Sequence, residues 1–246
     1  MAGFIVLAFI VKHARIRPCV YSKISVRGVA VGFPERDGSL KISGPCGVLE
    51  LAVSVPKVSE SSQQQKVTVV ICHPHPLFEG TLHNKVVHTL ARTFKQQGLY
   101  AVRFNFRGVG HSAGEYSHGI GETADLAAVI DWVKAQQPDH EIWLAGFSFG
   151  GYVAYRGASR FNVNQLLLVA PAVVNFDFGS EVEPNCPTFL IQGMADEVVA
   201  AEAVLAWAEK LAQPPQIKRF EEAGHFFHGR LVDLRKVIEQ HYFSSF

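Results

Sequence analysis

The sequence is poor in the features that mark several large classes of protein. Its charge is nearly balanced, with 23 basic against 22 acidic residues, and methionine occurs only 2 times in 246 residues. A balanced charge gives no electrostatic basis for binding nucleic acid or an anionic membrane surface. Hydrophobic residues make up 48% of the chain, which excludes global disorder. The composition therefore predicts a globular protein with no nucleic-acid partner.

Cysteines are few and far apart. The four are Cys19, Cys46, Cys72 and Cys186, and none forms a C-x-x-C pair. Zinc sites and redox motifs of that kind need such a pair. A chain of this length also builds its core without a disulfide framework. We expect buried or idle thiols in a reducing compartment.

Long hydrophobic runs are also missing. The apolar run at residues 2–11 is far shorter than the about 20 residues that a membrane-spanning helix needs. Its basic residues follow it, whereas those of a signal peptide precede the apolar run. We interpret residues 1–38 as an N-terminal extension with no assigned role and residues 39–246 as one domain. We expect a cytoplasmic protein with no integral membrane span.

The sequence does contain a regular alternation of strand and helix patterns. Residues 24–55 alternate in short pieces that predict a hairpin-like β start. The following pattern predicts strands at residues 67–72, 100–106, 141–147, 165–170, 188–192 and 217–221, and helices at residues 84–97, 122–137, 149–160, 200–212 and 231–242. This rhythm is typical of an open, mostly parallel sheet with helices on both faces. In such sheets function collects in the loops at the carboxyl ends of the strands.

One of these loops carries a G-x-S-x-G motif, Gly146-Phe147-Ser148-Phe149-Gly150, between a strand and a helix. The small residues on either side of the serine permit a sharp turn that raises its hydroxyl above the sheet edge. The same turn directs the Phe149 N–H toward the oxygen of a bound carbonyl. The motif predicts Ser148 as a nucleophile and Phe149 as one oxyanion donor.

A serine nucleophile needs a base and an acid that orients it. Asp196 and His225 follow the last two predicted strands, in the chain order serine, acid, histidine that this type of sheet requires. Glu197 and His228 are the nearest rivals. We predict a triad of Ser148, Asp196 and His225, with an activity that falls as the imidazole becomes protonated.

The loop after the first parallel strand, which begins His73-Pro74-His75-Pro76-Leu77, is expected to supply the second oxyanion donor. Proline has no N–H, so His75 and Leu77 are the candidates. The rival interpretation is a metal bound by His73 and His75, but no carboxylate or cysteine stands beside them at a useful spacing. We expect no metal.

A glycine-rich loop at residues 107–114 also follows a strand. It does not open a helix as a dinucleotide fingerprint would, and the chain has no phosphate-binding G-x-x-x-x-G-K-[ST] motif. We interpret the loop as structural, bordering the pocket and within reach of substrate. We expect no cofactor.

Taken with these motifs, the chain resembles the α/β-hydrolase superfamily, and more narrowly a group of small, lidless bacterial serine hydrolases that are esterase-like. The matching stretches run from about residue 40 to the C-terminus and include His73-Pro74-His75-Pro76, residues 102–110, Gly121-Glu122 with Asp125-Leu126, the Ser148 motif, and the Asp196 and His225 loops. Glu79 and Leu82-His83 depart from the pattern. The resemblance implies an α/β-hydrolase fold.

Residues 171–187 are too short to form a substantial cap domain, so we expect an open, shallow pocket. The sequence predicts a serine hydrolase that cleaves an ester or related acyl bond of a small molecule through an acyl-enzyme. A thioesterase, amidase or peptidase would use the same residues, and a catalytically idle binding or scaffold protein could share the fold. The oligomeric state is left open.

Overall fold

The protein is built on one mixed sheet. The computed structural model describes residues 32–57 and 65–244. Within these residues the strand order is β1-β2-β4-β3-β5-β6-β7-β8. The strands are β1 Gly38–Gly44, β2 Gly47–Ser54, β3 Val67–Cys72, β4 Tyr100–Phe104, β5 Glu141–Phe147, β6 Gln165–Val169, β7 Thr188–Gly193 and β8 Gln216–Phe220. β2 pairs antiparallel with both β1 and β4, whereas β4, β3 and β5 to β8 pair parallel. All the parallel strands therefore end at one edge.

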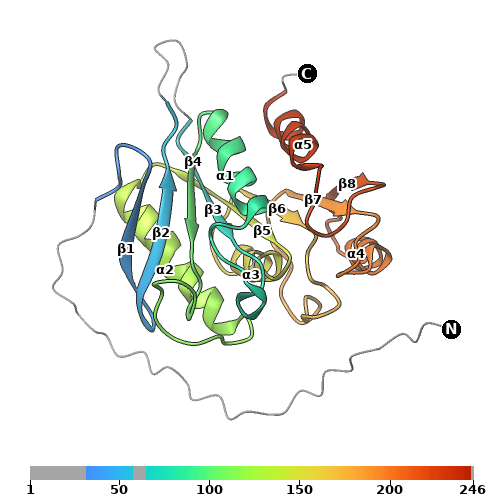
Figure 1. The fold of residues 1–246 in the computed structure, drawn as a ribbon, viewed down its shortest axis with the longest axis horizontal. Helices are drawn as coiled ribbons and strands as arrows, with labels where there is room; N and C mark the ends of the chain where they lie inside the picture. The colour runs from blue at the N-terminus through green and yellow to red at the C-terminus, as the bar shows by residue number, and fades with distance from the viewer. Residues whose placement is uncertain (1–31, 58–64, 245–246) are drawn as a thin grey trace.

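Helices cover both faces of this sheet (Figure 1). They are α1 Lys85–Gln96, α2 Ile120–Gln136, α3 Phe149–Ala158, α4 Ala201–Ala208 and α5 Leu231–Phe243. Buried side chains of α1 and α5 pack into one core, and those of α2, α3 and α4 pack into the other. The predicted mostly parallel α/β-hydrolase sheet, flanked by helices, is confirmed.

Local sequence signals explain several element boundaries. All residues of β3 are buried, as expected for a continuous apolar strand inside a parallel sheet. The Asn84 side chain caps α1 by accepting hydrogen bonds from the backbone N–H groups of Val86 and Val87 at 2.9 and 3.4 Å. Gly98 follows that helix with φ of 88°, a conformation that glycine adopts without steric cost. These boundaries match the predicted ones within a residue or two.

Other elements differ from the prediction. The hairpin-like β start predicted in residues 24–55 is present as the antiparallel pair of β1 and β2, although β1 begins at Gly38, directly after Asp37, in a dipeptide that is typical of a turn. The helix predicted at residues 200–212 ends at Ala208, and turns fill the remainder before the two prolines. Residues 24–31 of the predicted β start lie outside the described residues.

The described chain begins just inside the predicted extension. Phe33 stacks on Trp132 at 5.2 Å between ring centroids and meets Tyr100 edge-on at 5.4 Å. Phe33, which lies within the predicted extension, thus already packs against the domain.

Nothing that resembles a cap interrupts the fold between β6 and β7. Residues 171–187 contain turns but neither helix nor strand. Among the residues that the structure describes, no helix is both long and apolar enough to cross a membrane.

The glycine-rich loop after β4 is anchored by a buried ion pair. The Arg107 guanidinium donates two hydrogen bonds to the Asp125 carboxylate, at 2.9 and 2.8 Å, and the Arg107 backbone N–H donates a third at 3.0 Å. Only 6% of the arginine side chain and none of the aspartate side chain is exposed. Arg107 therefore has a structural role, and its charge is compensated inside the fold.

Removing one partner of this ion pair is expected to destabilise the protein strongly. Asp125→Ala leaves the Arg107 charge buried without a partner, which costs about 3–5 kcal/mol of unfolding free energy. Urea denaturation measures the loss. Asp139→Ala is the matched control, since its partner Lys66 and Asp139 itself are both largely exposed and such pairs contribute about 0–1 kcal/mol. Equal losses in the two variants would contradict a structural role for the Arg107–Asp125 pair.

Candidate active site

Ser148 occupies a strained turn between β5 and α3. Its backbone has φ of 56° and ψ of −119°, a conformation that residues other than glycine rarely adopt. A Cβ on Gly146 would lie 2.1 Å from the carbonyl oxygen of Gly150, and a Cβ on Gly150 would lie 2.3 Å from that of Cys72. Only glycine fits at both positions, which is the physical reason for the spacing seen in the sequence. The turn stands at the edge where the parallel strands end.

Asp196 and His225 form a buried pair at the same edge. His225 Nδ1 lies 2.8 Å from Asp196 Oδ2, with 2% of the histidine side chain and none of the aspartate side chain exposed. The other carboxylate oxygen accepts hydrogen bonds from the backbone N–H groups of Val198 and Val199 at 2.9 and 2.7 Å. Gln192 Nε2 donates a further bond to Oδ2 at 3.1 Å. The carboxylate is therefore fixed in direction and holds the Nδ1 edge of the imidazole.

These contacts also keep Asp196 ionised. Burial acts to raise the pKa of its carboxyl, but the hydrogen bond with His225 and those from the Val199 and Val198 amides outweigh it, so the pKa is lowered. An ionised Asp196 bonded to Nδ1 places a proton on that nitrogen. This leaves Nε2 as the basic nitrogen of the ring.

The rival residues have other contacts. Glu197 Oε2 accepts the backbone N–H of His225 at 3.1 Å, so it supports the loop rather than the imidazole. His228 stacks on Phe226 with ring centroids 5.7 Å apart. The structure thus pairs the imidazole of His225 with Asp196 and not with Glu197.

His225 also lies close to the residue that precedes the serine. The rings of Phe147 and His225 have centroids 5.0 Å apart. Phe147 is the last residue of β5 and Ser148 follows it directly. The three predicted residues therefore come from the carboxyl ends of β5, β7 and β8 to one region of the sheet edge.

The loop after β3 contains both candidates for the second oxyanion donor, His75 and Leu77, and their contacts differ. The Leu77 N–H donates a hydrogen bond to His75 Nδ1 at 3.2 Å, and the Leu77 side chain is largely exposed. The His75 ring packs on the Phe149 ring at 5.0 Å. Phe149 begins α3, so its own N–H has no acceptor within the helix. Because the Leu77 amide is already bonded, His75 is the stronger candidate for the second donor.

His73 is built into the same loop as a neutral structural group. Its Nε2 accepts the Phe106 backbone N–H at 3.0 Å, and its Nδ1 lies 2.7 Å from the Pro74 carbonyl oxygen, to which it donates. Both ring nitrogens are occupied, so neither offers a free electron pair to a metal. No group of three metal-binding side chains is found in residues 32–57 and 65–244.

The buried His73 makes stability depend on pH. Burial lowers the pKa of His73 to about 3, whereas histidine in an unfolded chain has a pKa of about 6.5. Between these values the unfolded chain binds a proton that the folded protein excludes. Stability therefore falls as the pH drops through this window, by up to about 1.4 kcal/mol per pH unit.

His73→Gln is expected to remove about one proton from this dependence, because a glutamine amide can accept from Phe106 and donate to Pro74 without titrating. Unfolding free energies measured in urea between pH 7 and pH 4 give the slope. Identical slopes for wild type and His73→Gln would show that His73 is not the group that stays unprotonated in the folded protein.

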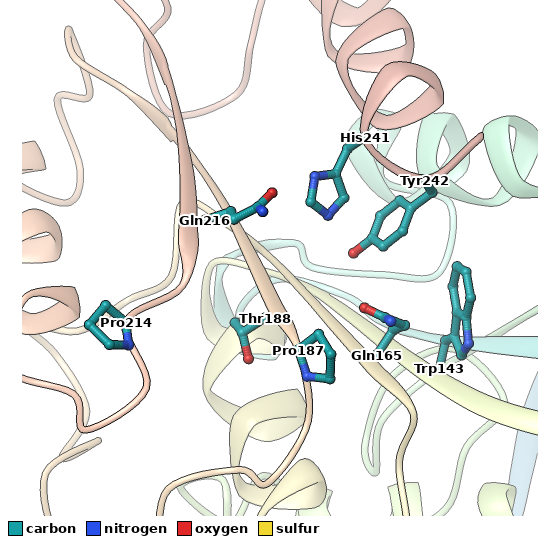
Figure 2. A pocket seen from close by; sticks show the side chains of 8 residues that line it. All are labelled: Trp143, Gln165, Pro187, Thr188, Pro214, Gln216, His241 and Tyr242. Atoms are coloured by element: carbon teal, nitrogen blue, oxygen red, sulfur yellow. The ribbon is translucent and has the colours of Figure 1, made fainter. Parts of the chain in front are cut away.

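A separate cavity of about 520 Å³ lies at the opposite edge of the sheet (Figure 2). It is lined by the first residues of the strands β6 to β8, by Trp143, and by His241 and Tyr242 near the end of α5. The parallel strands begin at that edge and end at the edge where Ser148 lies. The cavity is therefore distinct from the candidate active site.

Comparisons with known proteins agree with this fold. The family model described as X-Pro dipeptidyl-peptidase (S15 family) matches residues 47–185, more than half of the chain. A crystal structure of a serine hydrolase without a lid from Xanthomonas campestris is 43% identical, with a TM-score of 0.81, covering 85% of this chain and 95% of that one. A serine hydrolase homologue from Coxiella burnetii is 42% identical, with a TM-score of 0.81, covering 86% of this chain and 100% of that one.

A curated relative, an uncharacterized protein of Rickettsia prowazekii, is 30% identical over 209 residues, which are 81% of this chain and 86% of the relative. The sheet order, the strained serine and these matches lead to one family. The chain belongs to the α/β serine hydrolases, in the group that the X-Pro dipeptidyl-peptidase (S15) model describes.

Proposed function

We propose that the protein hydrolyses an ester or related acyl bond of a small molecule, with Ser148 as nucleophile, His225 as general base and Asp196 as its orienting acid. The observation that carries the proposal is the buried Asp196–His225 pair, 2.8 Å long, at the sheet edge where Ser148 holds a φ of 56°. That pair fixes the tautomer in which Nε2 can take a proton from a serine hydroxyl.

The proposed reaction has two halves. Ser148 Oγ attacks the acyl carbon while His225 Nε2 takes the hydroxyl proton, and the N–H groups of Phe149 and His75 bind the oxyanion. The intermediate collapses as His225 gives the proton to the leaving alcohol, which leaves an acyl-serine. Water then attacks this ester with His225 again as base, the carboxylic acid departs, and Ser148 recovers its proton.

Membership of the family does not determine whether the protein cleaves an ester or a peptide bond. The S15 match covers Ser148 but ends at residue 185, before Asp196 and His225, so it does not carry the peptidase activity to this chain. The absence of helix or strand in residues 171–187 supports an open site for small esters. A peptidase remains the second candidate, because it would use the same three residues.

Fluorophosphonate labelling combined with two chromogenic substrates tests the proposal. We expect labelling that Ser148→Ala abolishes, and turnover of p-nitrophenyl acetate well above that of Ala-Pro-p-nitroanilide. Faster cleavage of the anilide, relative to each substrate's uncatalysed rate, would assign a dipeptidyl-peptidase instead. Folded wild-type protein that is not labelled would favour an idle scaffold and overturn the proposal.

A further inference from the structure

A group of aromatic rings surrounds the proposed oxyanion donors. His75 has ring centroids 4.8 Å from Phe78, 4.8 Å from Tyr116 and 6.0 Å from Phe176. The Phe149 ring lies among them, 5.0 Å from Phe176 and 5.8 Å from Tyr116. We call His75, Phe78, Tyr116 and Phe176 the aromatic wall, with Phe149 beneath it.

Backbone contacts tie this wall to the nucleophile. The Ala172 N–H donates to the Ser148 carbonyl oxygen at 3.3 Å, and the Phe176 N–H donates to the Ala172 carbonyl oxygen at 3.2 Å. On the other side, Gly150 packs so closely on the end of β3 that an added Cβ would lie 2.5 Å from the His73 carbonyl oxygen. Two of the three loops that carry the wall, those after β3 and β6, are thus held directly against the Ser148 turn.

The wall is open to solvent, unlike the core beneath it. Phe78 is 71% exposed, whereas Phe149 is fully buried. His75, Tyr116 and Phe176 are partly buried. Further exposed apolar side chains follow the carboxyl ends of the parallel strands: Leu77, Ile120 and Val174 follow β3, β4 and β6, and Val198 and Phe226 follow β7 and β8. Grouped exposed apolar side chains of this kind mark binding surfaces.

The groups in and behind the wall present no free charge. Burial, with a smaller contribution from His118, lowers the pKa of His75 to about 4, so its imidazole is neutral at neutral pH. Glu122 accepts hydrogen bonds from the Ser117 and Gly119 amides, both at 2.7 Å. Arg107 is paired with Asp125. A charged substituent would find no counter-ion among these groups, and the His118 ring, 4.7 Å from that of Tyr116, is exposed to solvent.

We propose that the aromatic wall binds the acyl group of the substrate, and that this group is an uncharged aromatic ring such as benzoyl. The inference rests on the proposed function, since it uses Ser148 and the oxyanion donors to place the carbonyl. A carbonyl held by Phe149 and His75 has its substituent beside these rings. Aromatic rings prefer offset or edge contacts at about 4.5–7 Å, which a saturated ring of similar size does not reproduce.

Two ethyl esters and three variants test this specificity. In each protein the kcat/KM for ethyl benzoate is divided by the kcat/KM for ethyl cyclohexanecarboxylate. The intrinsic reactivities of the two esters cancel when the ratio of a variant is compared with that of wild type. We expect Phe78→Ala and Tyr116→Leu each to lower this ratio by about three- to tenfold, as the loss of one aromatic contact implies. Val232→Ala, an exposed apolar residue on α5, should leave the ratio unchanged. Fluorophosphonate labelling of each variant reports that its Ser148 turn is folded.

The outcomes separate this inference from the proposed function. An unchanged ratio in both wall variants, a wild-type preference for the saturated ring beyond the difference in uncatalysed rates, or labelled protein that cleaves neither ester would overturn the inference alone. Unlabelled wild-type protein would overturn the proposed function and the inference with it.

Discussion

Ser148→Ala is expected to lower kcat for a short ester by about 10⁶-fold, the loss found when a triad serine is removed. The hydroxyl oxygen is the atom that forms the acyl bond, and no other hydroxyl stands at the turn between β5 and α3. Alanine has the same Cβ as serine, so it adds no backbone strain at φ of 56°. The remaining rate should come from the oxyanion donors and from substrate binding alone.

The measurement is steady-state hydrolysis of p-nitrophenyl acetate with circular dichroism to show that the variant is folded. Ser180→Ala is the matched control, because Ser180 lies exposed in the segment between β6 and β7 and has no part in the proposed reaction. Activity of Ser148→Ala within about tenfold of wild type, far above the loss expected for a nucleophile, would place the nucleophile elsewhere.

Asp196→Asn is expected to lower kcat by about 10⁴-fold. The amide oxygen can still accept from Val198 and Val199, which turns the amide NH₂ toward His225 Nδ1. The NH₂ is a donor, so the ring must accept at Nδ1 and carry its proton on Nε2. In that tautomer Nε2 cannot take the proton of Ser148. The NH₂ would also face the donating Nε2 of Gln192.

Glu197→Gln is the control for this variant, because it neutralises the adjacent carboxylate and leaves an oxygen that can accept the His225 N–H. We expect a change of no more than a few fold, as one weakened hydrogen bond of about 1 kcal/mol implies. The kcat of both variants across pH 5–9 checks the assignment. A loss in Glu197→Gln as large as that in Asp196→Asn would mean that the acid has been misassigned.

Much of the fold was readable from local sequence because local forces set it. The continuous apolar run of β3 and the Asn84 cap of α1 each act within a few residues. The Ser148 motif was readable for a similar reason, since its glycines are demanded by contacts of 2.1 and 2.3 Å around one turn. Candidates for the acid and base followed from the order of strand ends.

Features that depend on distant contacts were not readable. The two oxyanion candidates are equivalent in the sequence, because the hydrogen bond from the Leu77 amide to the His75 ring, although it joins residues only two apart, depends on how the whole loop is folded. Arg107 and Asp125 are 18 residues apart, and no local pattern in the sequence predicts that they form an ion pair. The aromatic wall joins loops that follow β3, β4 and β6, so it exists only after the sheet has formed. The start of β1 at Gly38 is not readable either, because the Asp37-Gly38 pair favours a turn in isolation.

The backbone at Ser148 has a cost that the rest of the fold must carry. A residue other than glycine at such a φ is less stable by about 1–3 kcal/mol, and the packing of β5 and α3 holds the serine there. Selection for stability alone would favour glycine at this position. A serine kept in this conformation is therefore a sign that the protein has been selected for chemistry at residue 148, at the expense of a more stable chain.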